Sequence, residues 1–108
     1  MNNFSKSQRL LTKIDFDFVF SRAKKISTKY FVVLYRDNKI SHSRLGIILA
    51  KKMVPKAHDR NKIKRLIRES FRTNKIKPVD IVFLARPGLA KITNHEFISS
   101  IEQAWSKI

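Results

Sequence analysis

Between residues 59 and 73, side chains able to bind an anion recur at the spacing of one face of an α-helix. The positions i, i+3, i+4, i+7 and i+11 of this face hold Asn61, Lys64, Arg65, Arg68 and Arg72. The like-charged pairs Lys64–Arg68 and Arg68–Arg72 each cost roughly a few tenths of a kcal/mol in a helix. A face that only kept the protein in solution would mix both signs of charge. The spacing therefore predicts a surface that binds an external polyanion.

Few residues in the sequence, by contrast, could catalyse hydrolysis. The chain has three histidines and eight acidic residues, and no pattern joins a histidine to a nucleophile or a base. A two-metal nuclease needs several converging carboxylates, but Asp15 and Asp17 are the only close pair, and their side chains diverge in a helix and face opposite ways in a strand. The absence of cysteine excludes a Cys-based zinc site. We therefore predict no catalytic residue and no metal ligand in this chain.

The charge of the whole chain favours the same kind of partner. The 108 residues carry a net charge of +16, and residues 51–77 hold eleven basic residues against two acidic ones. Such an excess attracts polyphosphate, so nucleic acid is the expected partner and an anionic membrane a distant second. No apolar run reaches the roughly 18 residues of a membrane span, and no secretory signal is expected after Met1. We expect one domain over 1–108, flexible at 1–8, in the cytoplasm.

The helix that carries the basic face must be held by a core. Its opposite stripe is formed by Ile63, Leu66, Ile67, Ser70 and Phe71. We expect Asp59 to be its N-cap and Asn74 to end it in the left-handed conformation. A last helix is expected after Thr93, which opens a capping box with Glu96. Trp105 is expected in the core or at its rim, and stacking on a base is the less favoured alternative.

Three segments rich in β-branched and aromatic residues predict strands, at 30–35, 44–50 and 79–85. A short polar connection joins the first two, so we expect them to form an antiparallel hairpin. The third is apolar without alternation, which is typical of a central strand covered on both faces. Residues 21–29 are expected to form a basic connector.

Residues 14–20 leave two structures open. Phe16, Phe18 and Phe20 alternate as in a strand, whereas Phe16, Val19 and Phe20 have the spacing of a helix. The rings also have two possible places. Core is the commoner fate of phenylalanine, but at the lip of a cleft a ring can stack on an unpaired base, for about 1–3 kcal/mol.

The basic segment and its neighbours resemble the protein component of bacterial ribonuclease P. The matching positions are Lys51-Lys52, Ala57 and Arg60-Asn61-x-x-Lys64-Arg65-x-x-Arg68-Glu69, preceded by Arg9-Leu10 and by Phe16 with Val19-Phe20. The resemblance extends over nearly the whole chain, from Arg9 to the last helix. It departs at residues 53–55, where many members have a glycine and this chain has Met-Val-Pro.

The resemblance implies an α+β fold, a small two-layer sandwich in the order α-β-β-α-β-α, with residues 14–20 as a short helix. It implies a left-handed crossover around the basic helix, although about 98% of such connections are right-handed. It also implies that the protein is a subunit of ribonuclease P that binds the catalytic RNA and the 5′ leader of precursor tRNA and promotes removal of that leader. The RNA would perform the cleavage with Mg²⁺, and no protein partner would be required.

Two groups of residues would carry this function. By the resemblance, the catalytic RNA would be contacted by Lys51, Lys52, Arg60, Asn61, Lys64, Arg65 and Arg68, and the helical spacing adds Arg72. The leader would lie in a cleft lined by Phe16, Phe20 and a residue of the first strand, either Leu34 or Tyr35.

Two other classes of protein share the charge. A ribosomal protein or general RNA chaperone would bind RNA without preference for a leader. A DNA-binding module would use residues 60–72 as a recognition helix, but residues 44–50 predict a strand where a helix-turn-helix needs a helix. A face made almost wholly of Lys and Arg also suits phosphates better than base edges.

Overall fold

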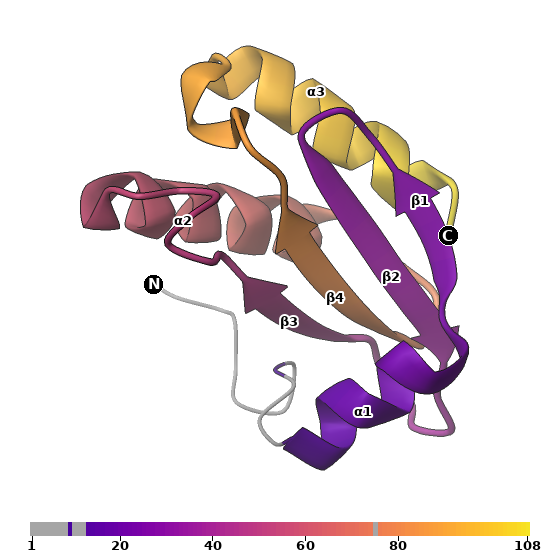
Figure 1. Cartoon of the computed structure of the whole chain (residues 1–108). Helices are drawn as coiled ribbons and strands as arrows, with labels where there is room; N and C mark the ends of the chain where they lie inside the picture. Colours follow the sequence, from indigo (N-terminus) through magenta and orange to yellow (C-terminus); the bar gives the residue numbers. More distant parts are fainter. Residues whose placement is uncertain (1–8, 10–12, 75) are drawn as a thin grey trace.

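The structure is a computed structural model that describes residues 9, 13–74 and 76–108. Its elements in chain order are α1 (Lys13–Arg22), β1 (Lys24–Ser27), β2 (Phe31–Asp37), β3 (Arg44–Ile48), α2 (Ala57–Thr73), β4 (Val79–Ala85), the short 3₁₀ helix η2 (Leu89–Lys91) and α3 (Asn94–Ser106) (Figure 1). The α+β class is confirmed, and residues 14–20 are helical. The predicted order lacks one strand, β1. The expected flexibility of residues 1–8 lies outside the described residues.

The strands form one mixed sheet in the order β1-β2-β4-β3. The central place of β4 is confirmed: it pairs antiparallel with β2 and parallel with β3. The predicted hairpin between the first two of the three expected strands is wrong, because β4 lies between β2 and β3. A strand that is apolar on both faces gains most from a neighbour on each edge, and this outweighs the shorter hairpin connection. The left hand of the β3–α2–β4 connection stays a prediction.

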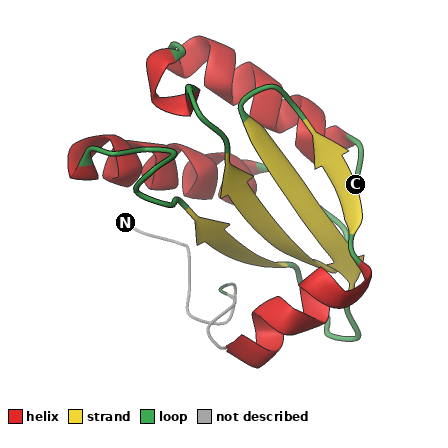
Figure 2. Cartoon of the chain, viewed as in Figure 1, coloured by secondary structure: helices red, strands yellow, loops and turns green. Residues whose placement is uncertain are grey.

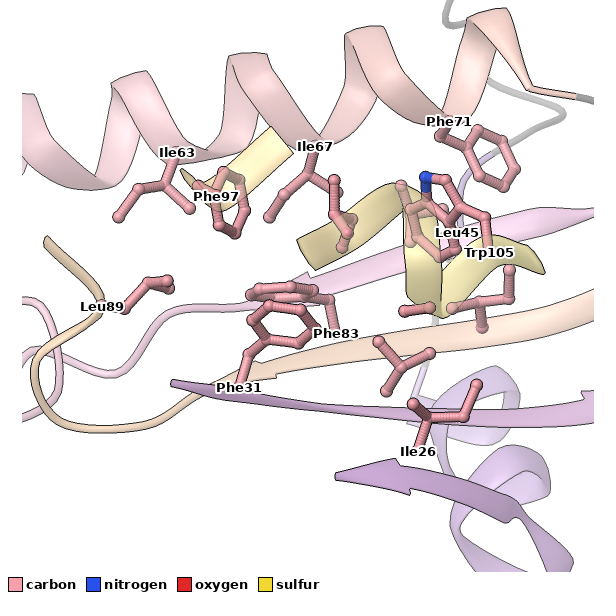
Figure 3. Close-up of a cluster of buried hydrophobic side chains, with 14 of the residues drawn as sticks. Ile26, Phe31, Leu45, Ile63, Ile67, Phe71, Phe83, Leu89, Phe97 and Trp105 are labelled. Carbon is pink, nitrogen blue, oxygen red and sulfur yellow. The ribbon is translucent and has the colours of Figure 1, made fainter. Parts of the chain in front are cut away.

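Helices cover both faces of this sheet (Figures 1 and 2). The main core lies between the sheet and the pair α2 and α3, whereas α1 makes a smaller contact with the opposite face. In Figure 3, Ile63 and Ile67 of α2 point toward the sheet, where the rings of Phe31 and Phe83 stack with centroids 4.9 Å apart. Phe97 of α3 meets both rings edge-on. The predicted apolar stripe of α2 is therefore confirmed as core.

Strand β1 replaces part of the basic connector expected at residues 21–29. Its residues pair antiparallel with β2, and Ile26 is its only buried residue. A single apolar residue among cations gives almost no strand signal in the sequence. The strand forms because the edge of β2 offers backbone hydrogen bonds, and its exposed lysines protect the new edge from pairing with another chain.

The ends of α2 differ from the expected ones. The helix begins at Ala57 rather than after Asp59, with Lys56 as an N-cap that makes no side-chain hydrogen bond. Asp59 lies in the first turn, where a negative charge is favoured by the helix dipole. At the other end Asn74 is extended, not left-handed. Its side-chain amide donates to the Ser70 carbonyl at 2.7 Å, and this satisfies a terminal acceptor without the left-handed turn.

The two helices of the main core are joined by a buried hydrogen bond. Thr93 caps α3 as predicted, by accepting from the Glu96 amide. The indole Nε1 of Trp105 donates to Ser70 Oγ at 2.9 Å, and both residues are 5% exposed. The expected core position of Trp105 is confirmed, and the polar residue within the apolar stripe of α2 is explained, because a buried indole N–H needs an acceptor.

The variant Ser70→Ala is expected to lower the free energy of unfolding by about 1–3 kcal/mol, because it leaves the indole N–H buried without an acceptor. Urea denaturation followed by the fluorescence of Trp105 measures this. Ser106→Ala is the matched control: this exposed hydroxyl of α3 donates only to the Gln103 carbonyl, and its loss should change stability by less than about 0.5 kcal/mol. Equal effects of the two changes would contradict the assigned role of the Ser70–Trp105 bond.

Candidate nucleic-acid interface

Burial of the apolar stripe of α2 turns its basic stripe outward. Ile63, Ile67 and Phe71 are buried, whereas Asn61 and Arg65 are exposed. An open hollow of about 450 Å³ lies on this outer side, lined by Asn61, Lys64, Arg65, Arg68 and Glu69. The structure thus brings together four of the residues predicted to contact RNA. We call this set, Asn61, Lys64, Arg65 and Arg68, the α2 surface.

Two other predicted RNA contacts have partners within the protein. The guanidinium of Arg60 donates to the Val54 and Pro55 carbonyls at 2.9 and 2.8 Å. Arg72 forms an ion pair with Glu69 one turn earlier on α2. Arg60 therefore stabilises the segment that leads into α2, a role that the sequence did not reveal. Glu69 offsets part of the charge that Arg72 would present to a phosphate.

The segment fixed by Arg60 follows the lysine pair at the start of the β3–α2 connection. Lys51 and Lys52 are exposed. The turn that carries them is closed by hydrogen bonds from the amides of Met53 and Val54 to the Ala50 carbonyl, both at 3.0 Å. The loop path that the Met-Val-Pro segment made hard to predict is thus defined, with Val54 buried in the core.

Arg9 adds a cation that sequence reasoning treated only as part of a motif. It forms a parallel bridge with Leu45 at the outer edge of β3. Burial lowers the pKa of Arg68, and the positive charge of Arg9 lowers it further. Arg68 nevertheless remains charged at neutral pH. The Arg-Leu motif was the signal that pointed to this residue.

An aromatic surface lies on the opposite face of the sheet. Val19 of α1 is buried against Val82 of β4, and Phe16 and Leu34 pack around this contact. Phe20 is 46% exposed, and its ring centroid lies 6.4 Å from that of Phe16. We call Phe16, Phe20 and Leu34 the α1 surface.

Tyr35 does not belong to the α1 surface. It packs against the main core on the opposite face of the sheet, as alternation along a strand requires when Leu34 faces α1. Of the two candidates for the position on the first predicted strand, only Leu34 shares a face with Phe16. The inclusion of Tyr35 in that set is therefore wrong.

Lys25 lies beside the α1 surface and was missed. It pairs directly with Leu34 across β1 and β2, so the two side chains are on the same face. It is exposed and supplies a cation at the border of an apolar surface. Only the strand pairing places Lys25 on this face, because in the sequence it is one of several basic residues between positions 22 and 29 and nothing distinguishes it from the others.

A buried ion pair crosses the sheet near α1. Arg44 donates to both carboxylate oxygens of Asp80 at 2.9 and 2.7 Å, and Asn38 donates to the same carboxylate at 2.8 Å. Asp80 is fully buried. The hydrogen bond with Asp80 raises the pKa of Arg44, against the opposing effect of burial. No pattern in the sequence indicated this ion pair.

Other classes of site are not found in the described part of the chain. Among residues 9, 13–74 and 76–108, no group of three or more His, Cys, Asp or Glu side chains is placed to hold a metal ion. Within the same ranges no helix has the length and apolar character to cross a membrane.

The fold and these surfaces define a class: a small basic α+β domain with a cationic helix face suited to phosphates and an aromatic surface suited to unpaired bases. The chain matches the family model described as "Ribonuclease P" over residues 4–108. It is 57% identical over 105 residues to the ribonuclease P protein component of Legionella pneumophila (strain Lens), covering 97% of this chain and 92% of that protein. It is 43% identical over 107 residues to that of Haemophilus influenzae (strain PittGG), covering 97% and 90%.

Solved structures agree. The Staphylococcus aureus RNase P protein superposes with a TM-score of 0.83 and 36% identity, covering 91% of this chain and 92% of that one. The Thermotoga maritima RNase P protein superposes with a TM-score of 0.82 and 37% identity, covering 93% of this chain and 96% of that one. The chain belongs to the ribonuclease P protein family. The predicted function as the protein subunit of a ribonucleoprotein endoribonuclease of tRNA processing is thereby confirmed.

Proposed function

We propose that this subunit binds the catalytic RNA through the α2 surface and the 5′ leader of precursor tRNA through the α1 surface, in the cytoplasm. The arrangement of the two surfaces carries the proposal. The apolar stripe of α2 packs toward one face of the sheet, which turns its basic stripe outward, and α1 covers the other face (Figure 1). One rigid domain can therefore hold two RNA segments at a fixed separation.

The chemistry of each surface suits its proposed RNA. Lys and Arg side chains along a helix bind phosphates without regard to sequence, which is what docking onto a folded RNA requires. The exposed ring of Phe20 and the apolar Leu34 suit unpaired bases, because every base has a flat face that stacks on an aromatic ring. Lys25 supports this role, since it adds a partner for the phosphates of a single strand.

In this proposal the RNA, not the protein, binds Mg²⁺. The chain would supply no ligand to Mg²⁺, and it would instead favour binding of the ions and the substrate by the RNA. Its own contribution is positive charge placed against two polyanions, which otherwise repel each other and need cations between them.

Cleavage of a precursor tRNA by a bacterial ribonuclease P RNA at low Mg²⁺, with and without this protein, tests the proposal. The expected result is that the protein restores cleavage and the protein alone has no activity. Tight binding of the RNA with unchanged cleavage would instead show a general RNA-binding protein. Repeating the assay at high Mg²⁺, where the RNA needs less help, controls for inactive RNA.

A further inference from the structure

Few apolar contacts fix the orientation of α1 on the sheet. Val19 is the only buried residue among the ten of the helix, and Ile14 is 79% exposed. Val19 and the half-buried Phe16 hold the helix over about one turn, which restricts its tilt and rotation less than a longer apolar contact would. Polar contacts between α1 and the sheet therefore contribute to where its aromatic side chains lie.

Those contacts come from one row across the sheet. Asp80 of β4 pairs with Arg36 of β2 on one side and with Arg44 of β3 on the other. Directly paired residues project from the same face, here the face that carries α1. Asp80 is fully buried, and the arginines on either side of it in the row contact opposite ends of the helix.

Arg44 holds the first turn of α1. Two of its nitrogens bind the Asp80 carboxylate, which fixes the guanidinium plane. The third nitrogen, Nη1, lies 3.5 Å from Asp15 Oδ1. Both ends of this second pair are less than a quarter exposed, so water screens the attraction only partly.

Arg36 holds the last turn. Its Nη1 donates to the Phe18 carbonyl at 2.7 Å and to Ser21 Oγ at 2.9 Å. Its guanidinium also stacks on the Phe18 ring, with Cζ 3.7 Å from the centroid. A cation is favoured at this end, where the helix dipole is negative and carbonyls lack helical partners.

The two contacts flank the buried residue on the side away from Phe20. Asp15 and Ser21 lie about 9 Å apart along the helix axis at 1.5 Å per residue. At about 100° per residue, Phe18 and Phe20 lie on opposite sides of Val19. Release of the contacts would therefore let α1 tilt and would move Phe20 relative to Leu34.

We propose that Arg36 and Arg44 are positioning residues that set the angle of α1 on the sheet and thereby shape the α1 surface for an unpaired leader base. This inference rests on the proposed leader-binding function. Neither arginine touches the leader; both act through α1.

The test uses holoenzyme assembled from a bacterial ribonuclease P RNA and protein variants. It compares the Kd for a precursor tRNA with the Kd for the mature tRNA, which has no leader. The double variant Asp15→Asn/Arg36→Gln frees both ends of α1 and leaves the Arg44–Asp80 pair intact. It should weaken precursor binding about 5- to 150-fold, the effect of losing one stacked base. Mature tRNA and RNA subunit affinities should stay within about twofold, and amides of residues 13–22 should exchange faster.

Three further variants make the result decisive. Asp17→Asn/Lys39→Gln changes the charge equally, on α1 and beside β2, without touching the row, and should bind like the parent. Arg36→Lys, which keeps a donor for the Phe18 carbonyl, should retain most of the leader affinity. If Phe20→Ala loses leader affinity while Asp15→Asn/Arg36→Gln keeps it, the positioning role is refuted and the α1 surface stands. If Phe20→Ala also keeps it, leader binding by the α1 surface is refuted as well.

Discussion

Raising the salt concentration from about 50 to about 200 mM is expected to weaken binding of the ribonuclease P RNA about 100- to 500-fold. Each phosphate contact releases a condensed counterion, so affinity falls by a power of the salt concentration. Five cations are expected to face the RNA, namely Lys51, Lys52, Lys64, Arg65 and Arg68. Arg60 and Arg72 are expected to add less, because Arg60 binds backbone carbonyls and Arg72 binds Glu69. Five contacts give a log–log slope of about −3.5 for single strands to −4.5 for duplex.

Single variants measure how much each residue contributes to this slope. Arg65→Gln should make it less steep by about 0.7 to 0.9, the share of one contact. Arg72→Gln is the matched control on the same helix: its ion pair with Glu69 predicts a smaller change. Both side chains are on the outer side of α2, so neither variant should change the midpoint temperature of thermal unfolding. An affinity for the RNA that does not depend on salt would refute electrostatic docking, and a large loss of stability in Arg65→Gln would mean that its face is misassigned.

The largest loss of stability is expected from Arg44→Met, which should lower the free energy of unfolding by about 3–5 kcal/mol. The change removes both hydrogen bonds from Arg44 to the buried carboxylate of Asp80 and leaves the one from the side-chain amide of Asn38. Because the pKa of Arg44 is raised in the folded state, the stabilisation from its positive charge is fully present at neutral pH and is lost as the pH rises into the strongly alkaline range. Urea denaturation at neutral pH measures the loss.

A double variant separates the cost of the unpaired charge from the value of the pair. Arg44→Met/Asp80→Val replaces both charges by apolar side chains and should recover most of the lost stability, as such replacements often do. Asp17→Asn supplies the exposed comparison, since its partner Lys13 is 89% exposed, and its effect should stay below about 1 kcal/mol. A loss below about 1 kcal/mol in Arg44→Met would show that the Asp80 carboxylate is not held as the structure indicates.

Much of the site could be predicted because it lies on one helix. On α2 the period of 3.6 residues separates Ile63 and Ile67 from Arg65, and burial of one stripe exposes the other whatever the helix packs against. The same local logic placed the Thr93 cap and the central strand β4, whose lack of alternation indicates cover on both faces. The family motif pointed to the same residues independently.

The errors about the sheet share one cause, which is that strand partners are chosen by the whole sheet. A local pattern shows that a segment is extended but not which segment lies beside it. The hairpin was therefore wrong, and β1 was missed because its pairing depends on the edge of β2. The choice between Leu34 and Tyr35 needed the register of β2 against β1 and β4.

The sequence by itself indicated a polyanionic partner and the cationic face of α2, because charge and helical period can be read from the chain alone, and the resemblance of its motifs indicated the family. Only the tertiary structure decided that Arg36, Asp80 and Arg44 meet in one row, since their alignment depends on strand order and register across three strands distant in the chain. It also decided that Arg60 holds a loop. Burial and hydrogen-bond geometry assign such roles, and they arise only when the segments pack together.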